Sequence, residues 1–295
     1  MTTVTEHTLQ PIAFLGMGLM GSRMASRLLH AQFAVAVWNR TATACQPLYA
    51  QGATPLDLSQ IAQYPVILLC LADDDAVQNV ISQCEDFLQA GQIIVDFSSL
   101  SVQCTQQLAQ RLAQKGVHWI DSPVSGGTMG AEQGSLVIFA GGNAQLIQQL
   151  QPIYHVLSQR VTHMGDVGTG QATKICNQLI VASASTVIAE AVALAERAGV
   201  NVTLLAPALA GGFADSKPFQ ILAPRMASQQ FEPVQWKVQT LSKDLNNAVQ
   251  LAQQHQLNIP VAQHALQQLQ QHQQQGYAEQ DLATIIYAVS RPNAS

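Results

Sequence analysis

Charged residues are scarce in this sequence, and positive ones are not in excess. Asp, Glu, Lys and Arg together make up 11% of its 295 residues, and the formal net charge at pH 7 is −5. A general nucleic-acid binder needs a basic surface that displaces counterions from phosphates, so the composition argues against that class. Hydrophobic residues nevertheless amount to 48%, which supplies a large core and argues against an intrinsically disordered chain.

Closely spaced cysteines and long uninterrupted apolar runs are also missing. The wide spacing of the 5 cysteines favours neither a disulfide framework nor a zinc site; they are Cys45, Cys70, Cys84, Cys104 and Cys176. The most apolar stretch, residues 179–194, is interrupted by Ser, Thr and Glu, so it predicts a buried helix rather than a membrane span. Residues 1–10 are polar where a secretory signal needs an apolar region. We therefore expect a cytoplasmic protein without membrane or nucleic-acid partners.

Short β-rich runs alternate with helical stretches between residues 11 and 165. Strands are predicted at Ile12–Leu15, Ala34–Trp38, Val66–Leu71, Gln92–Asp96, His118–Asp121 and Leu136–Ala140. Helices between them are predicted at Gly21–Ala31, Cys45–Gln51 and Val102–Lys115. This alternation is typical of a mostly parallel, doubly wound α/β sheet.

After about residue 170 the pattern becomes helical. A long helix is predicted over Lys174–Ala198, and shorter ones over Thr203–Leu209, Pro218–Ser228, Thr240–His255 and Val261–Gln274. Few β-rich runs interrupt these helices. The sequence therefore predicts two domains, an α/β domain over residues 1–168 and an all-α domain over residues 169–295.

The first predicted strand leads directly into a glycine-rich turn, Gly16-Met17-Gly18-Leu19-Met20-Gly21, which opens a predicted helix. In such a turn the first glycine permits a tight bend, the second lets the backbone approach a pyrophosphate, and the third allows close helix–strand packing. The helix N-terminus adds free N–H groups and the positive end of its dipole. The motif and its context together predict a dinucleotide site.

The end of the second predicted strand, Asn39-Arg40-Thr41, lacks a carboxylate. NAD sites usually carry Asp or Glu here to bind the ribose hydroxyls, and a carboxylate would repel a 2′-phosphate. Arg40 instead offers a guanidinium that pairs with a phosphate and stacks on adenine. The sequence therefore favours NADP over NAD, and the alternative is that Arg40 is only a solvated charge after a strand.

Two further segments carry polar groups suited to a small acid. Ser125, Gly126 and Gly127 follow a predicted strand, and consecutive glycines expose backbone N–H groups that hold a carboxylate without a charged side chain. In the long helix, Asn177 and Gln178 follow Lys174 by three and four residues and share its face. The lysine amine is a candidate proton donor to a carbonyl oxygen. A loop without a ligand and a solvated lysine are the alternatives.

In this order and at these separations, the four motifs resemble the β-hydroxyacid dehydrogenase family, relatives of 3-hydroxyisobutyrate dehydrogenase and 6-phosphogluconate dehydrogenase. The resemblance runs from Pro11 to about Tyr287. It implies an NAD(P)-binding Rossmann domain, a long interdomain helix, and an all-α domain that helps to form a dimer or tetramer. It also implies NADP(H)-dependent interconversion of a small semialdehyde or keto acid and its hydroxy acid.

The resemblance further implies roles for residues by position. Lys174 matches the catalytic lysine, with Asn177 and Gln178 orienting it or the substrate oxygen. Ser125, Gly126 and Gly127 match a loop that binds the substrate carboxylate, and Phe213 is a candidate to shape the pocket. The resemblance adds Leu71, Ala72, Ser99 and Lys243 to the cofactor contacts expected at residues 16–21, Asn39, Arg40 and Thr41. The sequence has no helix-spaced cluster of histidines and carboxylates that would support a metal site.

Within the family, the segments Lys174-Ile175-Cys176-Asn177-Gln178 and Gly211-Gly212-Phe213-Ala214 are most similar to the tartronate semialdehyde (2-hydroxy-3-oxopropionate) reductase branch. Gln178 stands where many members have a second asparagine. Two other functions stay open: imine reduction on the same scaffold, and non-catalytic dinucleotide binding. Imine-reducing relatives usually carry Asp or Tyr in place of Lys174, and a non-catalytic protein need not keep Ser125, Lys174 and Lys243.

Overall fold

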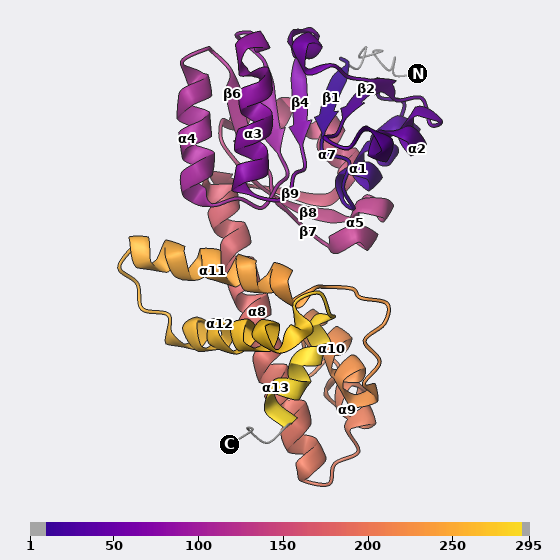
Figure 1. Ribbon diagram of the computed structural model, residues 1–295, viewed down its shortest axis with the longest axis vertical. Coiled ribbons are helices and arrows are strands. Elements are labelled where there is room, and N and C mark those ends of the chain that lie inside the picture. The colour runs from indigo at the N-terminus through magenta and orange to yellow at the C-terminus, as the bar shows by residue number, and fades with distance from the viewer. Residues whose placement is uncertain (1–9, 291–295) are drawn as a thin grey trace, which may run out of the picture. The chain divides into compact units, whose positions relative to one another are not determined.

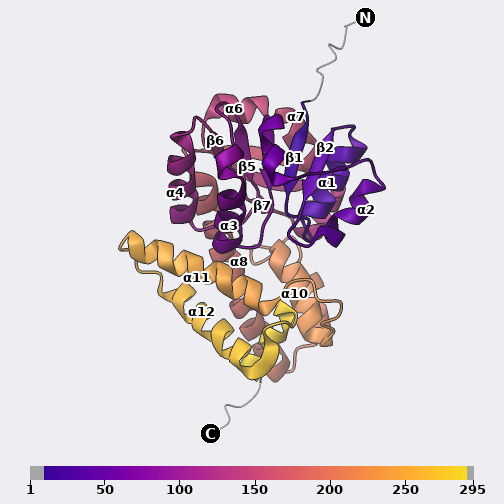
Figure 2. The ribbon, with the colours of Figure 1, turned by 45° about the horizontal axis from the view of Figure 1, so that its top comes forward.

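The computed structural model of the chain describes residues 10–290 (Figure 1). These residues form two compact units, and the chain passes from the first to the second after Lys174, inside helix α8 (Thr169–Arg197). The first unit contains a sheet with helices, and the second is helical (Figures 1 and 2). The predicted fold class, a doubly wound α/β part followed by an all-α part, is confirmed.

Within the described residues, the first unit is built on a nine-stranded sheet with the order β3-β2-β1-β4-β5-β6-β8-β7, and β9 pairs with β8. The strands are β1 (Ile12–Leu15), β2 (Val35–Trp38), β3 (Thr54–Pro55), β4 (Val66–Leu69), β5 (Ile93–Asp96), β6 (His118–Asp121), β7 (Val124–Ser125), β8 (Leu136–Gly141) and β9 (Ser158–Gly165). All strands from β1 to β6 are parallel to one another. Strand β8 is antiparallel to β6 and β7 and parallel to β9. The order reverses between β1 and β4, where open α/β sheets bind ligands beyond the strand ends.

Helices cover both faces of this sheet. They are α1 (Gly21–His30), α2 (Gln46–Tyr49), α3 (Asp74–Cys84), α4 (Val102–Ala113), α5 (Gly127–Gln133), α6 (Ala144–Gln149) and α7 (Gln151–Leu157). Successive side chains of a strand point to opposite faces, so Phe14 packs in a core with α1 and α7, whereas Leu15 packs in another with α3 and α4. Burial on both faces explains why β1 and β4 are wholly apolar.

The predicted strands and helices lie where the sequence pattern puts them, and most ends agree within two residues. The predicted strand Val66–Leu71 is too long, because β4 ends at Leu69 and the N–H of Leu71 donates to Ser98 Oγ instead. Helix α3 is missing from the prediction. Its start is marked by Asp73, whose side chain accepts from Ala76 N–H, and the acidic Asp74 and Asp75 of its first turn suit the positive end of the helix dipole.

Helix α8 begins five residues earlier than the predicted start at Lys174. The buried carboxylate of Asp121, 47 residues before Gly168, accepts hydrogen bonds from the N–H groups of Gly168 and Gln171. By length and composition α8 could cross a membrane, and 44% of its most apolar window is buried in the structure. The prediction of a buried helix is therefore right for one side only, because Ile180, Val187 and Leu194 are 66%, 54% and 71% exposed.

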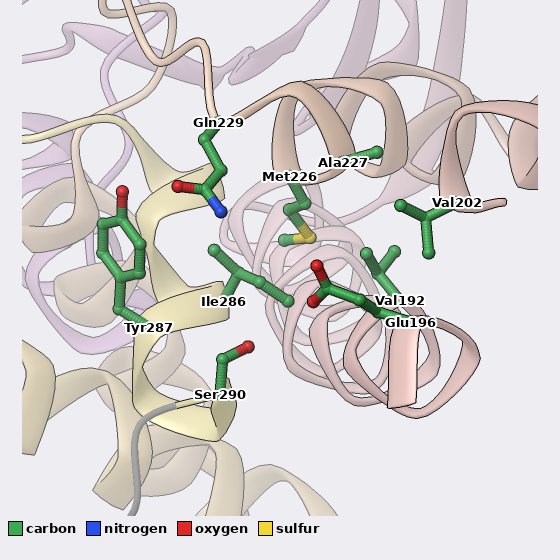
Figure 3. A pocket seen from close by; sticks show the side chains of 9 residues that line it. All are labelled: Val192, Glu196, Val202, Met226, Ala227, Gln229, Ile286, Tyr287 and Ser290. Carbon is green, nitrogen blue, oxygen red and sulfur yellow. The ribbon is translucent and has the colours of Figure 1, made fainter. Parts of the chain in front are cut away.

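The second unit continues from α8 with short and long helices. They are α9 (Leu205–Leu209), α10 (Lys217–Ser228), α11 (Val238–Gln254), α12 (Pro260–His272) and α13 (Ile286–Ser290). Helices α11 and α12 lie side by side, and Leu245 and Leu269 are fully buried (Figures 1 and 2). A cavity of about 60 Å³ lies among Glu196, Met226 and Tyr287 (Figure 3). It is too small for a dinucleotide, since ligand pockets begin at roughly 300 Å³.

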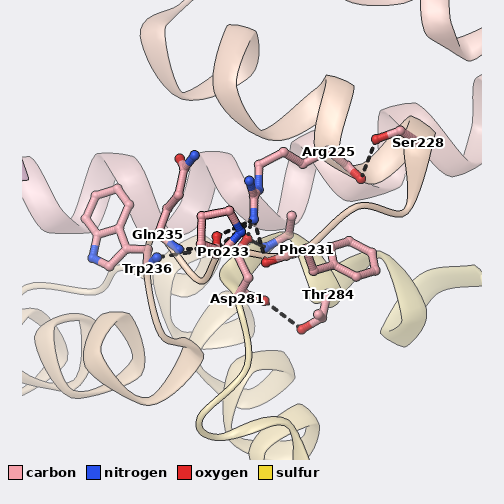
Figure 4. A network of polar contacts seen from close by, with 9 residues as sticks. Arg225, Ser228, Phe231, Pro233, Gln235, Trp236, Asp281 and Thr284 are labelled. Atoms are coloured by element: carbon pink, nitrogen blue, oxygen red, sulfur yellow. Dashed lines mark hydrogen bonds and ion pairs between the residues drawn. The ribbon is translucent and has the colours of Figure 1, made fainter.

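A buried ion pair holds the loop that leads into α11. Arg225 Nη2 lies 3.3 Å from Asp281 Oδ2 and donates to the carbonyl oxygens of Phe231 at 2.6 Å and Pro233 at 3.0 Å. Asp281 Oδ2 also accepts from the N–H of Gln235 at 2.8 Å (Figure 4). Residues 229–237 are thus fastened to the turn at residue 281, which fixes where α11 begins.

Candidate active site

The glycine-rich turn lies between β1 and α1, where the strand order reverses. Gly16 has a φ of +102°, and a Cβ there would lie 2.3 Å from the carbonyl oxygen of Cys70. A Cβ on Gly21 would lie 1.9 Å from the carbonyl oxygen of Gly16. A Cβ on Gly18 would meet no atom within 4 Å. The turn therefore packs tightly on one side and offers open backbone on the other, which fits a pyrophosphate.

The side chain of Asn39 ties this turn to the loop after β2. Its Oδ1 accepts a hydrogen bond from the N–H of Met17 at 2.9 Å, and its Nδ2 donates to the carbonyl oxygen of Thr41 at 2.9 Å. An aspartate could accept the first bond but could not donate the second. An amide therefore fits this position, and it brings no negative charge beside the exposed Arg40.

Leu71 and Ala72 follow β4 and lie next to the glycine-rich turn. A Cβ on Gly16 would come within 2.8 Å of Leu71 Cδ2, so the two segments are in close contact. The N–H of Leu71 donates to Ser98 Oγ at 2.9 Å, which holds the end of this strand against the loop after β5. Leu71 is half-buried and Ala72 is exposed.

Gln171 is a buried residue of α8 that sequence reasoning did not single out. Its Nε2 donates to the carbonyl oxygen of Ser98 at 2.8 Å, and its Oε1 accepts from the N–H of Leu100 at 3.1 Å. The half-buried Ser99 lies between these two anchored residues. The partners of the Gln171 side chain are more than 70 residues away in the chain, so local sequence carries no signal for this role.

Two buried aspartates, Asp96 and Asp121, end β5 and β6 and are paired in the sheet register. Burial raises the pKa of Asp121, and the hydrogen bonds from Gly168 and Gln171 oppose that rise. Burial also raises the pKa of Asp96 to about 7, and the Asp121 carboxylate adds to the effect. Within the part of the chain that the structure describes, Asp96 Oδ2 has no hydrogen-bond partner. Two buried acids thus end neighbouring strands at the carboxyl edge of the sheet, beyond which open α/β sheets bind ligands.

Ser125, Gly126 and Gly127 form the turn between β7 and α5. Ser125 is half-buried and pairs with Val137 of β8 in antiparallel register. Gly126 and Gly127 have φ values of +130° and +62° and are exposed. This turn presents a hydroxyl and bare backbone N–H groups close together, an arrangement that suits an anionic group.

Lys174 lies in the second turn of α8, and only 8% of it is exposed. Asn177 and Gln178 follow on the same helix, so their side chains share its side. Asn177 Nδ2 donates to Gln178 Oε1 at 2.8 Å, and Gln178 Nε2 donates to Asp244 Oδ2 of α11 at 2.5 Å. A buried lysine that shares one side of a helix with two side-chain amides is a candidate for proton transfer. Sequence reasoning did not find Asp244, because Gln178 and Asp244 are 66 residues apart.

Phe213 and Lys243 belong to the second unit. Phe213 is fully exposed on a loop in which the N–H of Gly211 donates to Asp215 Oδ2 at 2.7 Å. Lys243 is on α11, and its Nζ lies 3.8 Å from Asp244 Oδ1. Their contacts with substrate and cofactor remain predictions. Among residues 10–290 no group of three or more His, Cys, Asp or Glu side chains is placed to hold a metal ion.

Two family models match the chain, one to each part of it. Residues 11–165 match the NAD binding domain of 6-phosphogluconate dehydrogenase. Residues 168–289 match the NAD-binding domain of NADP-dependent 3-hydroxyisobutyrate dehydrogenase. The first match alone covers more than half of the 295 residues.

Individual proteins are similar over most of the chain. The 2-hydroxy-3-oxopropionate reductase of Escherichia coli K12 is 32% identical over 254 residues, which are 84% of this chain and 86% of the relative. A structure of Mycobacterium tuberculosis 3-hydroxyisobutyrate dehydrogenase with L-serine has a TM-score of 0.89 at 24% identity, over 96% of this chain and 100% of that chain. The structure of Psf3 in complex with NADP+ and 2-OPP has a TM-score of 0.82 at 24% identity, over 95% and 100%.

These findings differ in what they establish. At 24% identity the two solved structures establish the fold. The family match over residues 11–165 and the relative from E. coli go further, because each covers more than half of the chain. The chain belongs to the NAD(P)-dependent β-hydroxyacid dehydrogenase family of oxidoreductases.

Proposed function

We propose that this protein interconverts a small semialdehyde or keto acid and its hydroxy acid with NADP(H), with Lys174 as the proton donor and acceptor. One observation carries the proposal: Lys174 is buried on α8, a helix whose start is fixed by Asp121 at the carboxyl edge of the sheet. The glycine-rich turn and the Ser125 turn belong to the same unit. The reductase of E. coli supports the choice of substrate class.

The first unit fits an NADP cofactor. The open side of Gly18 is suited to the pyrophosphate, and the exposed Arg40 and Thr41 are suited to the 2′-phosphate. Leu71, Ala72 and Ser99 would line the cofactor beyond the turn, and Lys243 would reach it from α11. When bound, the cofactor supplies or accepts the hydride. NAD is the alternative for the same turn, since it lacks only the 2′-phosphate.

The chain's own residues would then bind the substrate and move one proton. Ser125 and the N–H groups of Gly126 and Gly127 hold the substrate carboxylate, and Phe213 shapes the pocket. Lys174 Nζ gives its proton to the carbonyl oxygen as this becomes a hydroxyl, and takes a proton in the opposite direction. Asn177 orients the amine or the substrate oxygen. Correct positioning of the reacting groups supplies much of the rate enhancement.

A panel of aldehyde acids tests this proposal: tartronate, succinic and methylmalonate semialdehydes and glyoxylate, each with NADPH and with NADH. We expect oxidation of NADPH with at least one of them. Lys174→Ala is expected to abolish turnover and leave NADPH binding nearly intact. Lys174→Arg, which keeps the positive charge and does not release a proton, is expected to be inactive as well. Turnover in either variant would remove Lys174 from the mechanism.

The two alternatives give different results in the same panel. A non-catalytic dinucleotide-binding protein would bind NADPH and oxidise it with none of the four acids. An imine reductase would oxidise NADPH only with cyclic or acyclic imines added to the panel. The buried amine of Lys174 favours the first proposal over both.

We also propose that the protein is a homodimer or homotetramer. Ile180, Val187 and Leu194 lie seven residues apart on α8 and are exposed in the single chain. Residues at this spacing lie on one side of a helix, so they form an apolar stripe that a second copy of the chain would cover.

A further inference from the structure

We propose that Asp244 is a positioning residue: through Gln178 it sets which end of the Asn177 side chain is turned toward the reacting groups. The inference rests on the function proposed above and adds a residue to it. Asp244, Gln178 and Asn177 form one hydrogen-bonded row, with distances of 2.5 Å and 2.8 Å. Asp244 and Gln178 are only 7% and 3% exposed, so bulk water does not compete for these bonds.

The chemistry of the row fixes the direction of each amide. An ionised carboxylate only accepts hydrogen bonds, whereas an amide has a donor end and an acceptor end. Gln178 must therefore turn its Nε2 to Asp244, which leaves its Oε1 for Asn177. Asn177 must in turn direct its Nδ2 to that oxygen, and its own Oδ1 then points the opposite way.

The acceptor atom that results, Asn177 Oδ1, is three residues after Lys174 on the same helix. Its suitable partners are donors, namely the amine of Lys174 or the hydroxyl of a hydroxy acid. Without a fixed acceptor at position 244, either amide can rotate by half a turn with little change in shape. Asn177 would then present a donor to another donor, and the proton-transfer geometry would be lost.

The charged and titratable groups near the row come from three helices. On α11, Lys243 Nζ lies 3.8 Å from Asp244 Oδ1. On α8, Lys174 is one turn before Gln178, and Cys176 is exposed. Helix α12, which packs on α11, carries the exposed His264, and His272, whose Nε2 is within hydrogen-bond distance of Thr284 Oγ1. A carboxylate placed at position 178 would therefore face one acidic group, Asp244.

A pair of substitutions that keep side-chain shape tests the row. Gln178→Glu places two carboxylates at hydrogen-bond distance, so one of them must hold a proton and its pKa rises. We expect kcat at pH 8 to fall about tenfold or more, with recovery as the pH is lowered toward 5 and little change in the KM for NADPH. Asp244→Asn alone should lower kcat less, because an amide at position 244 can still offer its oxygen.

The double variant Gln178→Glu with Asp244→Asn reverses the donor and the acceptor. The amide at position 244 donates to the new carboxylate, whose second oxygen accepts from Asn177. We expect kcat to return to within about threefold of the wild type, with a wild-type pH profile. A double variant as impaired as Gln178→Glu alone would overturn the proposal.

A matched control is available on α11 itself. The exposed Gln239 donates to Glu279, so Gln239→Glu makes the same chemical change in a pair to which the proposed function gives no role. This variant is expected to keep the wild-type kcat and pH profile. A pH-dependent loss in Gln239→Glu equal to that in Gln178→Glu would also contradict the proposal.

Thermal unfolding separates this inference from the proposed function. If the row exists, Gln178→Glu lowers Tm more at pH 8 than at pH 5, and the double variant removes this difference. That pattern in a protein inactive on every acid of the panel would leave the row standing and disprove the function. An active wild type in which Gln178→Glu has no pH-dependent effect on Tm or kcat would disprove the row and leave the function standing.

Discussion

Arg40 is the residue on which the proposed preference for NADP depends. It is exposed beyond β2, and Asn39 beside it holds the glycine-rich turn without adding a negative charge. Arg40→Ala is expected to raise the Kd for NADPH about tenfold, the effect of losing a charge-assisted hydrogen bond, and to leave that for NADH unchanged. Titration of each coenzyme by fluorescence measures both values. Lys115→Ala removes another exposed charge of this unit as a control, and equal losses for both coenzymes would refute the assignment.

Asp96 makes the stability of the fold depend on pH. Its pKa is raised from 3.8 to about 7, chiefly by burial, so between these values the folded state binds more protons than the unfolded state. Stability from this group is complete below pH 3.8 and falls as the pH rises through 7. Asp96→Asn should flatten this dependence and raise Tm above the wild type at pH 8. Melting curves from pH 5 to pH 8 check this, and parallel curves for both proteins would contradict it.

Residues were found from the sequence when their role depends on neighbours in the chain. Gly16 is required by the bend it makes and Gly21 by close packing on that bend, and Lys174 and Asn177 are related by helical spacing. Gln171, whose side chain has partners 71 and 73 residues away, has no such local signal. Asp121 and Asp244 were missed for the same reason, since each bonds across more than 40 residues. The groups proposed to touch ligands could thus be predicted, and the buried groups that hold them in place could not.

Among the elements, apolar strands and amphipathic helices could be placed from their periodicity, because each buries a defined face. The start of α8 could not, because Asp121 on β6 supplies its cap. Nor could the helices α5 to α7, which have only six or seven residues each and lie between β7 and β9. Short elements depend on the tertiary packing around them more than on their own pattern.

The Arg225–Asp281 pair is expected to stabilise the second unit. Asp281→Ala leaves the largely buried Arg225 without its carboxylate, and frees the N–H groups of Gln235 and Ala283. Breaking a buried pair in this way costs about 3–5 kcal/mol. Urea unfolding followed by circular dichroism measures the loss. Glu279→Gln, in the exposed pair with Lys237, is the control and should change little. An equally small effect of Asp281→Ala would show that the loop is held by other contacts.

At the scale of the whole molecule, the exposed side of α8 predicts self-association. Val187→Glu together with Leu194→Glu is expected to shift the mass measured by light scattering toward that of one 31.6 kDa chain, because charges disfavour a dehydrated interface. Leu257→Glu changes an equally exposed apolar residue outside α8 and should leave the mass unchanged. A monomeric wild type would contradict the proposal at once.

The passage of the chain between its units inside α8, and not through a linker, limits how this protein can be divided. A fragment ending at residue 167 would keep Asp121 but lose the N–H groups of Gly168 and Gln171 that it binds. The complementary fragment would carry Lys174 near an uncapped helix end. Split reporters and circular permutants should therefore open the chain elsewhere, for instance in residues 255–259 between α11 and α12, where neither piece loses this cap.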